Sequence, residues 1–270
     1  MNSHELEALV APVLAIARQA GAAILEVYRH PVEVTTKADE SPLTIADLRS
    51  HETIVQGLSK LDPSLPILSE EASAITFETR AQWRAFWLVD PLDGTKEFLK
   101  RNDEFTVNIA LVENHAPVLG VVYVPAGDAM YWGGSSIGAY RQIAGGPIET
   151  IHVQAQAPRK LRVVGSRSHA GDTLARNLPR LGEYELVQLG SSLKFCAVAE
   201  GRADVYPRFG PTSEWDTAAA QAVVEGAGGL VLDPKGTPLR YNTKSDLINP
   251  HFVAFGDRSR DWVGTLFSAD

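Results

Sequence analysis

The feature that most constrains this 270-residue chain is a six-residue segment, Asp90-Pro-Leu-Asp-Gly-Thr95. It directly follows residues 86–89, an apolar run that predicts a short buried strand. The proline fixes a turn after that strand, and the glycine lets the backbone approach a ligand closely. Both aspartate side chains and the leucine carbonyl can then point to the same side of the turn. Because Asp is also a common turn and capping residue, the segment alone leaves a structural role open.

Two further acidic segments occupy similar positions in the chain. Ser69-Glu70-Glu71 follows an apolar stretch at residues 66–68, and Trp215-Asp216 precedes a helix of small residues. Strand ends and helix starts converge at one edge of an α/β core. Carboxylates gathered there repel one another, and metal binding is the usual remedy. Oxygen ligands without His or Cys favour Mg²⁺ over zinc, so the sequence predicts a magnesium site.

Composition limits the other possibilities. With 44% hydrophobic residues, the length suits one large globular domain or two medium ones. The 33 acidic and 25 basic residues give a net charge of −8, which speaks against duplex nucleic-acid binding. The single cysteine, Cys196, excludes an internal disulfide and a Cys-x-x-Cys zinc site, and we expect it in the core. The apolar run at residues 8–16 is too short for a membrane span. A cytoplasmic location is therefore predicted, with peripheral association with the inner membrane left open.

Periodicity predicts an α/β (α+β) chain. We expect helices at 4–29, with a kink or late start at Pro12, and at 45–60, where Thr44 can cap. Residues 72–84 look exposed. Predicted strands lie near 105–112, 118–124, 130–132, 139–142, 161–165, 186–189, 204–206 and 230–232. Further helices are predicted near 96–100, 172–181, 193–200, 215–227 and 258–267. Gly145-Gly-Pro147 divides the chain into a metal-binding subdomain, 1–146, and a substrate-binding subdomain, 147–270, packed as one unit.

Together, the three acidic segments resemble the inositol monophosphatase superfamily of Mg²⁺-dependent, lithium-sensitive phosphatases. The resemblance covers nearly the whole chain and implies a layered αβαβα sugar-phosphatase fold. It implies one Mg²⁺ held by Glu70, Asp90 and the Leu92 carbonyl, and a second held by Asp90, Asp93 and Asp216. A third, weaker ion would lie near Glu70, which gives two or three ions in all.

The same resemblance implies catalytic roles. Asp47 would pair with Thr95, and Thr95 and Glu70 would orient the attacking water, although Asp47 alone would also suit a helix N-terminus. The N–H groups of Gly94 and Thr95 would hold phosphate oxygens. A direct role for Glu71 stays open.

Other segments resemble the 3′(2′),5′-bisphosphate nucleotidase branch of this superfamily, namely Thr36–Thr44, Leu99–Ala110, Ser166–His169, Gly190–Cys196 and Val198–Thr212. Arg208 stands where inositol-preferring relatives typically carry an acid, and its guanidinium suits a second phosphate. Ser191 and Lys194 are three residues apart, hence on one face of a predicted helix, and Gly190 and Ser192 at its start would help them hold the anion. His169 is a candidate base contact. The alternatives are solvated surface charge for Lys194 and Arg208, and a surface or capping role for His169.

The resemblance implies a phosphatase that removes the 3′-phosphate of adenosine 3′,5′-bisphosphate in sulfate assimilation, and that also acts on 3′-phosphoadenylyl sulfate. The expected partner is this small nucleotide, and the expected assembly is a monomer or homodimer. An inositol or sugar monophosphatase and a catalytically silent nucleotide-binding regulator remain alternatives. Gly134-Ser-Ser-Ile-Gly138 matches a serine-hydrolase elbow, but strand and turn residues follow it where an elbow needs a helix.

Overall fold

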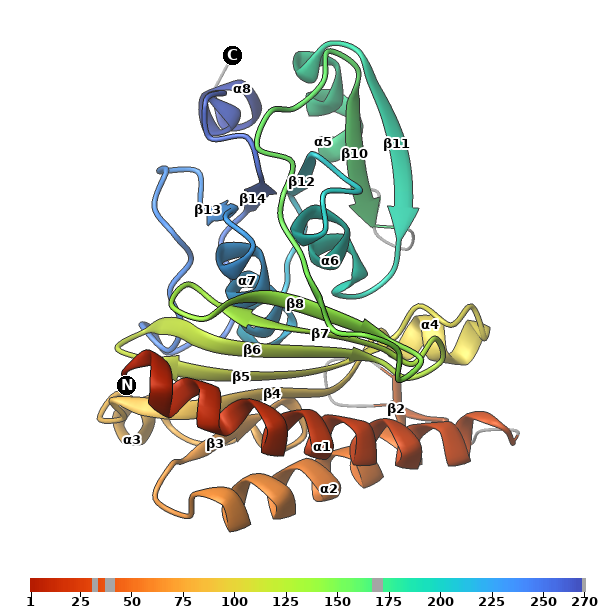
Figure 1. Ribbon diagram of the computed structural model, residues 1–270, viewed down its shortest axis with the longest axis vertical. Helices are drawn as coiled ribbons and strands as arrows, with labels where there is room; N and C mark the ends of the chain where they lie inside the picture. Colours follow the sequence, from red (N-terminus) through yellow and green to blue (C-terminus); the bar gives the residue numbers. More distant parts are fainter. Residues whose placement is uncertain (31–33, 37–41, 167–171, 269–270) are drawn as a thin grey trace.

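Two β-sheets organise the chain, whose computed structural model describes residues 1–30, 34–36, 42–166 and 172–268 (Figure 1). The first sheet has the order β3-β4-β5-β6-β7-β8-β9. Its strands are β3 (Ile67–Ser69), β4 (Ala85–Asp93), β5 (Thr106–Glu113), β6 (Ala116–Val124), β7 (Ala129–Gly134), β8 (Gly138–Ile143) and β9 (Glu149–Thr150). From β4 onward each strand pairs antiparallel with the next, and short turns join β5, β6, β7 and β8 in succession.

The second sheet has the order β11-β10-β12-β14-β13. Its strands are β10 (Leu161–Ser166), β11 (Tyr184–Leu189), β12 (Val205–Arg208), β13 (Leu230–Leu232) and β14 (Phe252–Phe255). A small separate pair joins β1 (Val34–Thr36) to β2 (Pro42–Thr44). The second sheet is mixed, since β10 pairs parallel with β11 and β12, whereas β14 runs antiparallel to β12 and β13.

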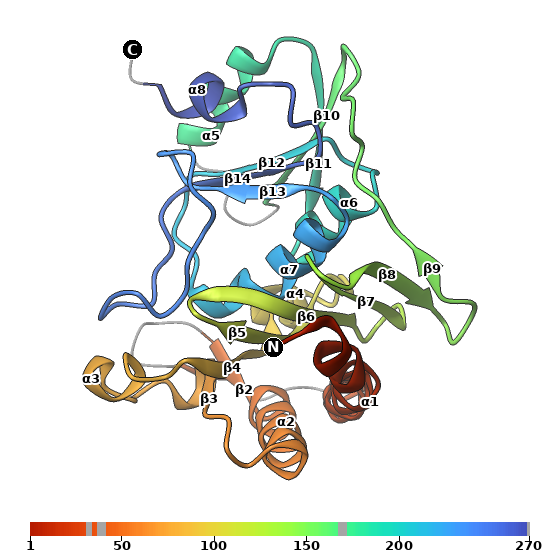
Figure 2. The same cartoon turned by 60° about the vertical axis from the view of Figure 1, so that its left-hand side comes forward.

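Helices complete five layers, which confirms the predicted αβαβα architecture (Figures 1 and 2). The pair α1 (Ser3–Tyr28) and α2 (Ile45–Leu61) covers the outer face of the first sheet. Between the sheets lie α6 (Leu193–Ala199) and α7 (Ala218–Gly226). The outer face of the second sheet packs on α5 (Asp172–Asn177) and α8 (Trp262–Phe267). The short elements are α3 (Phe77–Arg80), α4 (Thr95–Lys100), η1 (Glu70–Ala72), η2 (Leu178–Leu181) and η3 (Glu214–Asp216).

The central helix α7 lies very close to the first sheet. A Cβ built on Gly120 of β6 would stand 2.0 Å from the Ala219 carbonyl oxygen. Only glycine on the strand, facing the alanines of α7, permits this approach. The close packing brings the start of α7, and η3 just before it, to the edge of the sheet where β4 ends.

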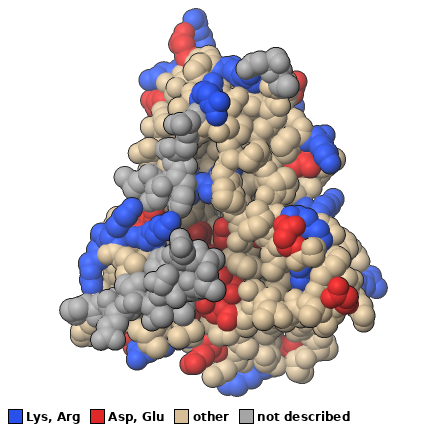
Figure 3. All heavy atoms as spheres, turned by 180° about the vertical axis from the view of Figure 1, so that it is seen from behind, with Lys and Arg blue, Asp and Glu red and all other residues tan. Residues whose placement is uncertain are grey.

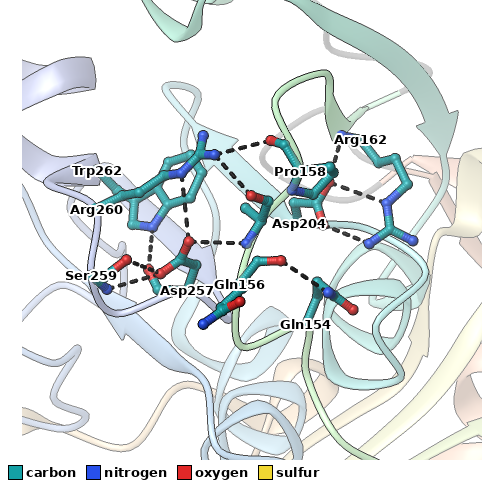
Figure 4. A network of polar contacts seen from close by, with 10 residues as sticks. Gln154, Gln156, Pro158, Arg162, Asp204, Asp257, Ser259, Arg260 and Trp262 are labelled. Atoms are coloured by element: carbon teal, nitrogen blue, oxygen red, sulfur yellow. Dashed lines mark hydrogen bonds and ion pairs between the residues drawn. The ribbon is translucent and has the colours of Figure 1, made fainter.

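A polar network holds the chain where it passes from the first sheet to the second (Figure 4). Asp257 accepts a hydrogen bond from the Ala157 N–H at 2.9 Å, and its own carbonyl accepts one from Trp262 Nε1 at 2.6 Å. Arg260 donates to the carbonyls of Ala157 and Pro158. These contacts tie the connecting segment to the start of α8.

Several sequence predictions need correction. α1 begins at Ser3, capped by Asn2, so a late start at Pro12 is wrong. β4 continues through the acidic segment to Asp93 because those residues still pair with β5. Residues 72–84 are not uniformly exposed, since Arg80 is 1% exposed. The structure also adds β14, which was not predicted, and α8 begins at Trp262 and not near residue 258. After residues 145–147, β9 pairs with β8 of the first sheet.

By length and composition alone, α1 could cross a membrane, a possibility that the prediction from residues 8–16 did not recognise. One face of α1 is nevertheless buried in the fold, through Leu6, Val13, Ala17, Ala20 and Ile24. That face packs on α2, β5 and β6. In this structure α1 is part of the core.

Candidate functional site

A cavity of about 410 Å³ opens where β4 ends, bounded by α4, the start of α6, β12 and η3. Most of the predicted site residues line it: Glu70, Asp90, Leu92, Asp93, Gly94, Thr95, Gly190, Ser191, Lys194, Arg208 and Asp216. On the face drawn in Figure 3, acidic side chains gather in the middle of the molecule, where its surface is hollowed. Asp47 lies behind Thr95, outside the cavity wall. His169 lies outside the described residues.

A β-bulge brings the two aspartates of β4 to one face. Asp90 pairs with Asn108 of β5, and Asp93 pairs with Thr106, so three steps on β4 match two on β5. In a regular strand, residues three apart point to opposite faces. The extra residue reverses this alternation, so both carboxylates lie on the same side as their partners on β5. Pro91 and Leu92 supply the bulge.

Hydroxyl and amide groups surround one oxygen of Asp93. Oδ2 lies 2.6 Å from Ser191 Oγ, 3.1 Å from Ser192 Oγ and 3.4 Å from Asn108 Nδ2. In the described part of the chain, no hydrogen-bond donor is assigned to the other oxygen, Oδ1. Sequence reasoning missed Thr106 and Asn108 as site residues, and it gave Ser192 a role with the anion and not with Asp93. Thr106 and Asn108 do carry a signal, because they are polar residues two apart on an otherwise apolar, buried strand.

Glu70, Asp90, Asp93 and Asp216 form the acidic cluster of the cavity. Burial and mutual repulsion dominate the electrostatics of this acidic cluster. The pKa of Asp90 is raised well above its usual range by burial and then by the charges of Glu70, Asp93 and Asp216. Burial and the charge of Asp93 likewise raise the pKa of Asp216. Backbone N–H groups oppose these shifts, from Leu92 to Asp90 at 3.0 Å and from Ser213 to Asp216 at 2.9 Å.

The acidic cluster offers only oxygen atoms as metal ligands, which fits a hard cation such as Mg²⁺ better than zinc. Neutralising such clustered carboxylates is what a divalent ion does. Among residues 1–30, 34–36, 42–166 and 172–268, no group of three or more His, Cys, Asp or Glu side chains already stands as a ligand set. The fit of Mg²⁺ to this site therefore rests on the oxygen ligands and on their negative charge.

The predicted pairing of Asp47 with Thr95 is confirmed. Thr95 Oγ1 donates to Asp47 Oδ1 at 3.3 Å. The other oxygen, Oδ2, accepts from the N–H and the hydroxyl of Thr44, at 2.8 and 2.6 Å. Thr44 is also the N-cap of α2, so the capping box of that helix orients the buried Asp47 carboxylate toward Thr95. Gly94 has φ of 92°, a left-handed conformation that favours glycine, and α4 begins immediately after it.

Two buried cations, Lys194 and Arg208, also line the cavity. Lys194 is 5% exposed, and its Nζ donates to the Ser191 carbonyl at 2.5 Å and to the Leu189 carbonyl at 3.3 Å. Burial lowers the pKa of Lys194 to about 8, although the charge of Asp93 opposes this. Arg208 is 9% exposed and donates to the carbonyls of Gly210 and Pro211. Neither residue is a solvated surface charge.

Two details of the predicted anion site are wrong. Ser191 precedes α6 and has φ of 50°, so it does not share a helical face with Lys194. Its hydroxyl contacts Asp93 and Thr106, both at 2.6 Å. The Gly190 N–H donates to the Glu104 carboxylate at 2.8 Å, which leaves it no hydrogen for an anion. Gly190 is required for packing, because a Cβ there would stand 2.8 Å from the Glu104 carbonyl.

Two predictions about residues outside the site are confirmed. Cys196 is buried in the core between the sheets. Residues 135–137 form the turn between β7 and β8, so a strand and not a helix follows the Gly-x-Ser-x-Gly match. The serine-hydrolase interpretation is therefore excluded for this segment.

Comparison with known proteins agrees with these observations. The model of the inositol monophosphatase family matches residues 5–258. The 3′(2′),5′-bisphosphate nucleotidases CysQ of Salmonella typhimurium and Escherichia coli K12 are each 49% identical over 242 residues, covering 89% of this chain and 96% of theirs. The crystal structure of CysQ from Bacteroides thetaiotaomicron superposes with a TM-score of 0.80 at 43% identity, covering 93% of this chain and 98% of that one. The chain therefore belongs to the inositol monophosphatase family.

Proposed function

We propose that the protein is a Mg²⁺-dependent 3′(2′),5′-bisphosphate nucleotidase, which hydrolyses adenosine 3′,5′-bisphosphate to AMP and phosphate. The observation that carries the proposal is the lining of one cavity, which combines carboxylates, among them the buried Asp90, with the buried cations Lys194 and Arg208. A substrate with two phosphates suits both groups of side chains, whereas an inositol monophosphate offers no second phosphate to the cations. The names of the relatives at 49% identity support the same choice.

The acidic cluster would hold two Mg²⁺, and a third, more weakly bound ion would lie near Glu70. Glu70, Asp90 and the Leu92 carbonyl would bind one ion, and Asp90, Asp93 and Asp216 would bind the second. When bound, Mg²⁺ makes a coordinated water a stronger nucleophile and stabilises the negative charge on the leaving oxygen.

Thr95 and Asp47 would prepare the attacking water. Because the Thr95 hydroxyl donates to Asp47, its oxygen is oriented to accept a hydrogen bond from a water in the cavity. The water proton can then pass to the Thr95 oxygen while the Thr95 proton passes to Asp47. Glu70, at the cavity wall, would orient the same water. The N–H groups of Gly94 and Thr95, at the start of α4, would hold oxygens of the 3′-phosphate.

Lys194 and Arg208 would hold the 5′-phosphate, with Ser191 beside them. His169 would contact the base. The same contacts would admit 3′-phosphoadenylyl sulfate, in which a sulfate extends the 5′-phosphate. The proposal places the enzyme in the cytoplasm, in sulfate assimilation, as a lithium-sensitive monomer or homodimer.

A phosphate-release panel tests the proposal. Adenosine 3′,5′-bisphosphate, inositol 1-phosphate and fructose 1,6-bisphosphate are each assayed with Mg²⁺, and again with added Li⁺. We expect the highest kcat/KM for the nucleotide, inhibition by Li⁺ and loss of release in Asp90→Asn and Asp93→Asn. Higher kcat/KM for the inositol ester would overturn the substrate assignment. Nucleotide binding without any phosphate release would instead support a silent regulator.

A further inference from the structure

The turn that carries Asp216 is held by a second, distant stretch of chain. Residues 212–217 lie against residues 241–249, the loop between β13 and β14. The Glu214 N–H donates to the Leu247 carbonyl, and the Asn249 N–H donates to the Thr212 carbonyl, both at 2.8 Å. Ser213 and Ile248 form an isolated β-bridge. The two segments are thus joined along the backbone as well as through side chains.

One side chain, Asn249, makes three of the contacts that fix this turn. Its Nδ2 lies 2.8 Å from the Ser213 carbonyl, 3.0 Å from Thr217 Oγ1 and 3.2 Å from Thr212 Oγ1. Its two amide hydrogens are therefore shared among three acceptors at both ends of the turn. Ser213 in turn donates its N–H to Asp216 Oδ2 at 2.9 Å. Asn249 thus holds the residue that orients the Asp216 carboxylate.

Two further buried side chains, Arg80 and Glu214, are linked to each other through Asn242 at the same turn. The Asn242 N–H donates to Glu214 Oε2 at 2.7 Å, and Arg80 Nη1 donates to Asn242 Oδ1 at 2.5 Å. Asn242 Nδ2 donates back to the Arg80 carbonyl at 2.6 Å. All three residues are 1% exposed. Because buried polar groups require hydrogen-bond partners, Asn242 fixes the positions of Arg80 and Glu214 relative to each other.

We propose that Asn249, together with Arg80, Asn242 and Glu214, positions the Asp216 carboxylate for metal binding. The inference rests on the proposed function, in which Asp216 is a metal ligand. None of the four residues touches substrate or the reacting atoms, so they are positioning residues. Replacing groups that orient a metal ligand typically weakens metal binding by about 10- to 100-fold. We expect a loss in this range for Asn249→Ala.

The test is Mn²⁺ binding without substrate, followed by the electron paramagnetic resonance signal of the free ion. The matched control is Asn177→Ala on α5, whose side-chain Nδ2 also donates to a backbone carbonyl at 2.8 Å, that of Thr173. We expect weaker Mn²⁺ binding in Asn249→Ala and wild-type binding in Asn177→Ala. In Asn249→Ala, raising Mg²⁺ should also restore most of the hydrolysis rate, because the loss is one of metal affinity.

Two results would overturn the inference: wild-type Mn²⁺ binding in Asn249→Ala, or an equal loss in Asn177→Ala. If Asn249→Ala does not fold, Asn249→Ser is measured in its place and judged by the same criteria. Asp216→Asn separates this inference from the proposed function. Wild-type Mn²⁺ binding in Asp216→Asn would contradict the metal assignment itself, whereas loss there with none in Asn249→Ala would contradict the positioning role alone.

Discussion

Replacing Arg208 tests whether this residue recognises a second phosphate. In the structure its guanidinium is buried at the cavity wall and donates to the carbonyls of Gly210 and Pro211 at 3.2 and 2.8 Å. Arg208→Ala therefore removes two kinds of interaction at once. It removes the support of the turn that follows β12, and it removes the proposed contact with the 5′-phosphate.

A comparison of two substrates separates these effects. Adenosine 3′,5′-bisphosphate and adenosine 3′-monophosphate share the base, the ribose and the reacting phosphate, and differ only in the 5′-phosphate. Damage to the turn lowers kcat/KM for both. Loss of a charge-assisted hydrogen bond costs about 1.5–3 kcal/mol and affects the bisphosphate alone. The ratio of the two kcat/KM values should therefore fall by about 10- to 150-fold.

The assay is phosphate release from each substrate by wild-type protein, Arg208→Ala and a control, Arg260→Ala. Arg260 also donates to backbone carbonyls, those of Ala157 and Pro158, but at the start of α8 (Figure 4). The control should leave the ratio unchanged. An equal loss on both substrates in Arg208→Ala would refute the second-phosphate assignment, whatever its size.

Three further predictions follow from burial and charge. Gly120→Ala should lower the free energy of unfolding by about 1–3 kcal/mol, because its Cβ would meet the Ala219 carbonyl; an unchanged urea midpoint would contradict this. Mg²⁺ binding should release protons and tighten as pH rises, because the raised pKa values of Asp90 and Asp216 keep protons that a metal must displace. Calorimetry in two buffers of different ionisation enthalpy measures that release, and identical heats would count against it. Finally, KM for the bisphosphate should rise above pH 8, where Lys194 loses its charge, while KM for the 3′-monophosphate stays level; parallel pH profiles would argue against a phosphate contact.

Local patterns predicted much of the fold. Alternation of apolar residues indicated β5 and β6 correctly, and Thr44 before an acid at the third helical position indicated the start of α2. The pairing of Asp47 with Thr95 followed from the family resemblance. These features depend on short stretches of chain or on a motif with a fixed geometry, so they are accessible without coordinates.

The remaining features depend on contacts between distant residues. Residues 72–84 were predicted to be exposed, and the partners Asn242 and Ser245, far along the chain, explain why Arg80 is buried among them. Helical spacing placed Ser191 beside Lys194, but the hydroxyl of Ser191 bonds to Asp93 and Thr106 and the residue stays outside α6. The bulge in β4 likewise requires the register with β5, which the sequence of β4 alone does not contain.

The most direct test of the proposed chemistry is to identify which phosphate leaves. Adenosine 3′,5′-bisphosphate is incubated with the protein and Mg²⁺, and the products are followed by phosphorus nuclear magnetic resonance. If metal ions on the acidic cluster bind the 3′-phosphate while Lys194 and Arg208 hold the 5′-phosphate, the products are adenosine 5′-monophosphate and inorganic phosphate. Neither product forms without Mg²⁺. Formation of adenosine 3′-monophosphate, or phosphate release that needs no divalent metal, would contradict the account.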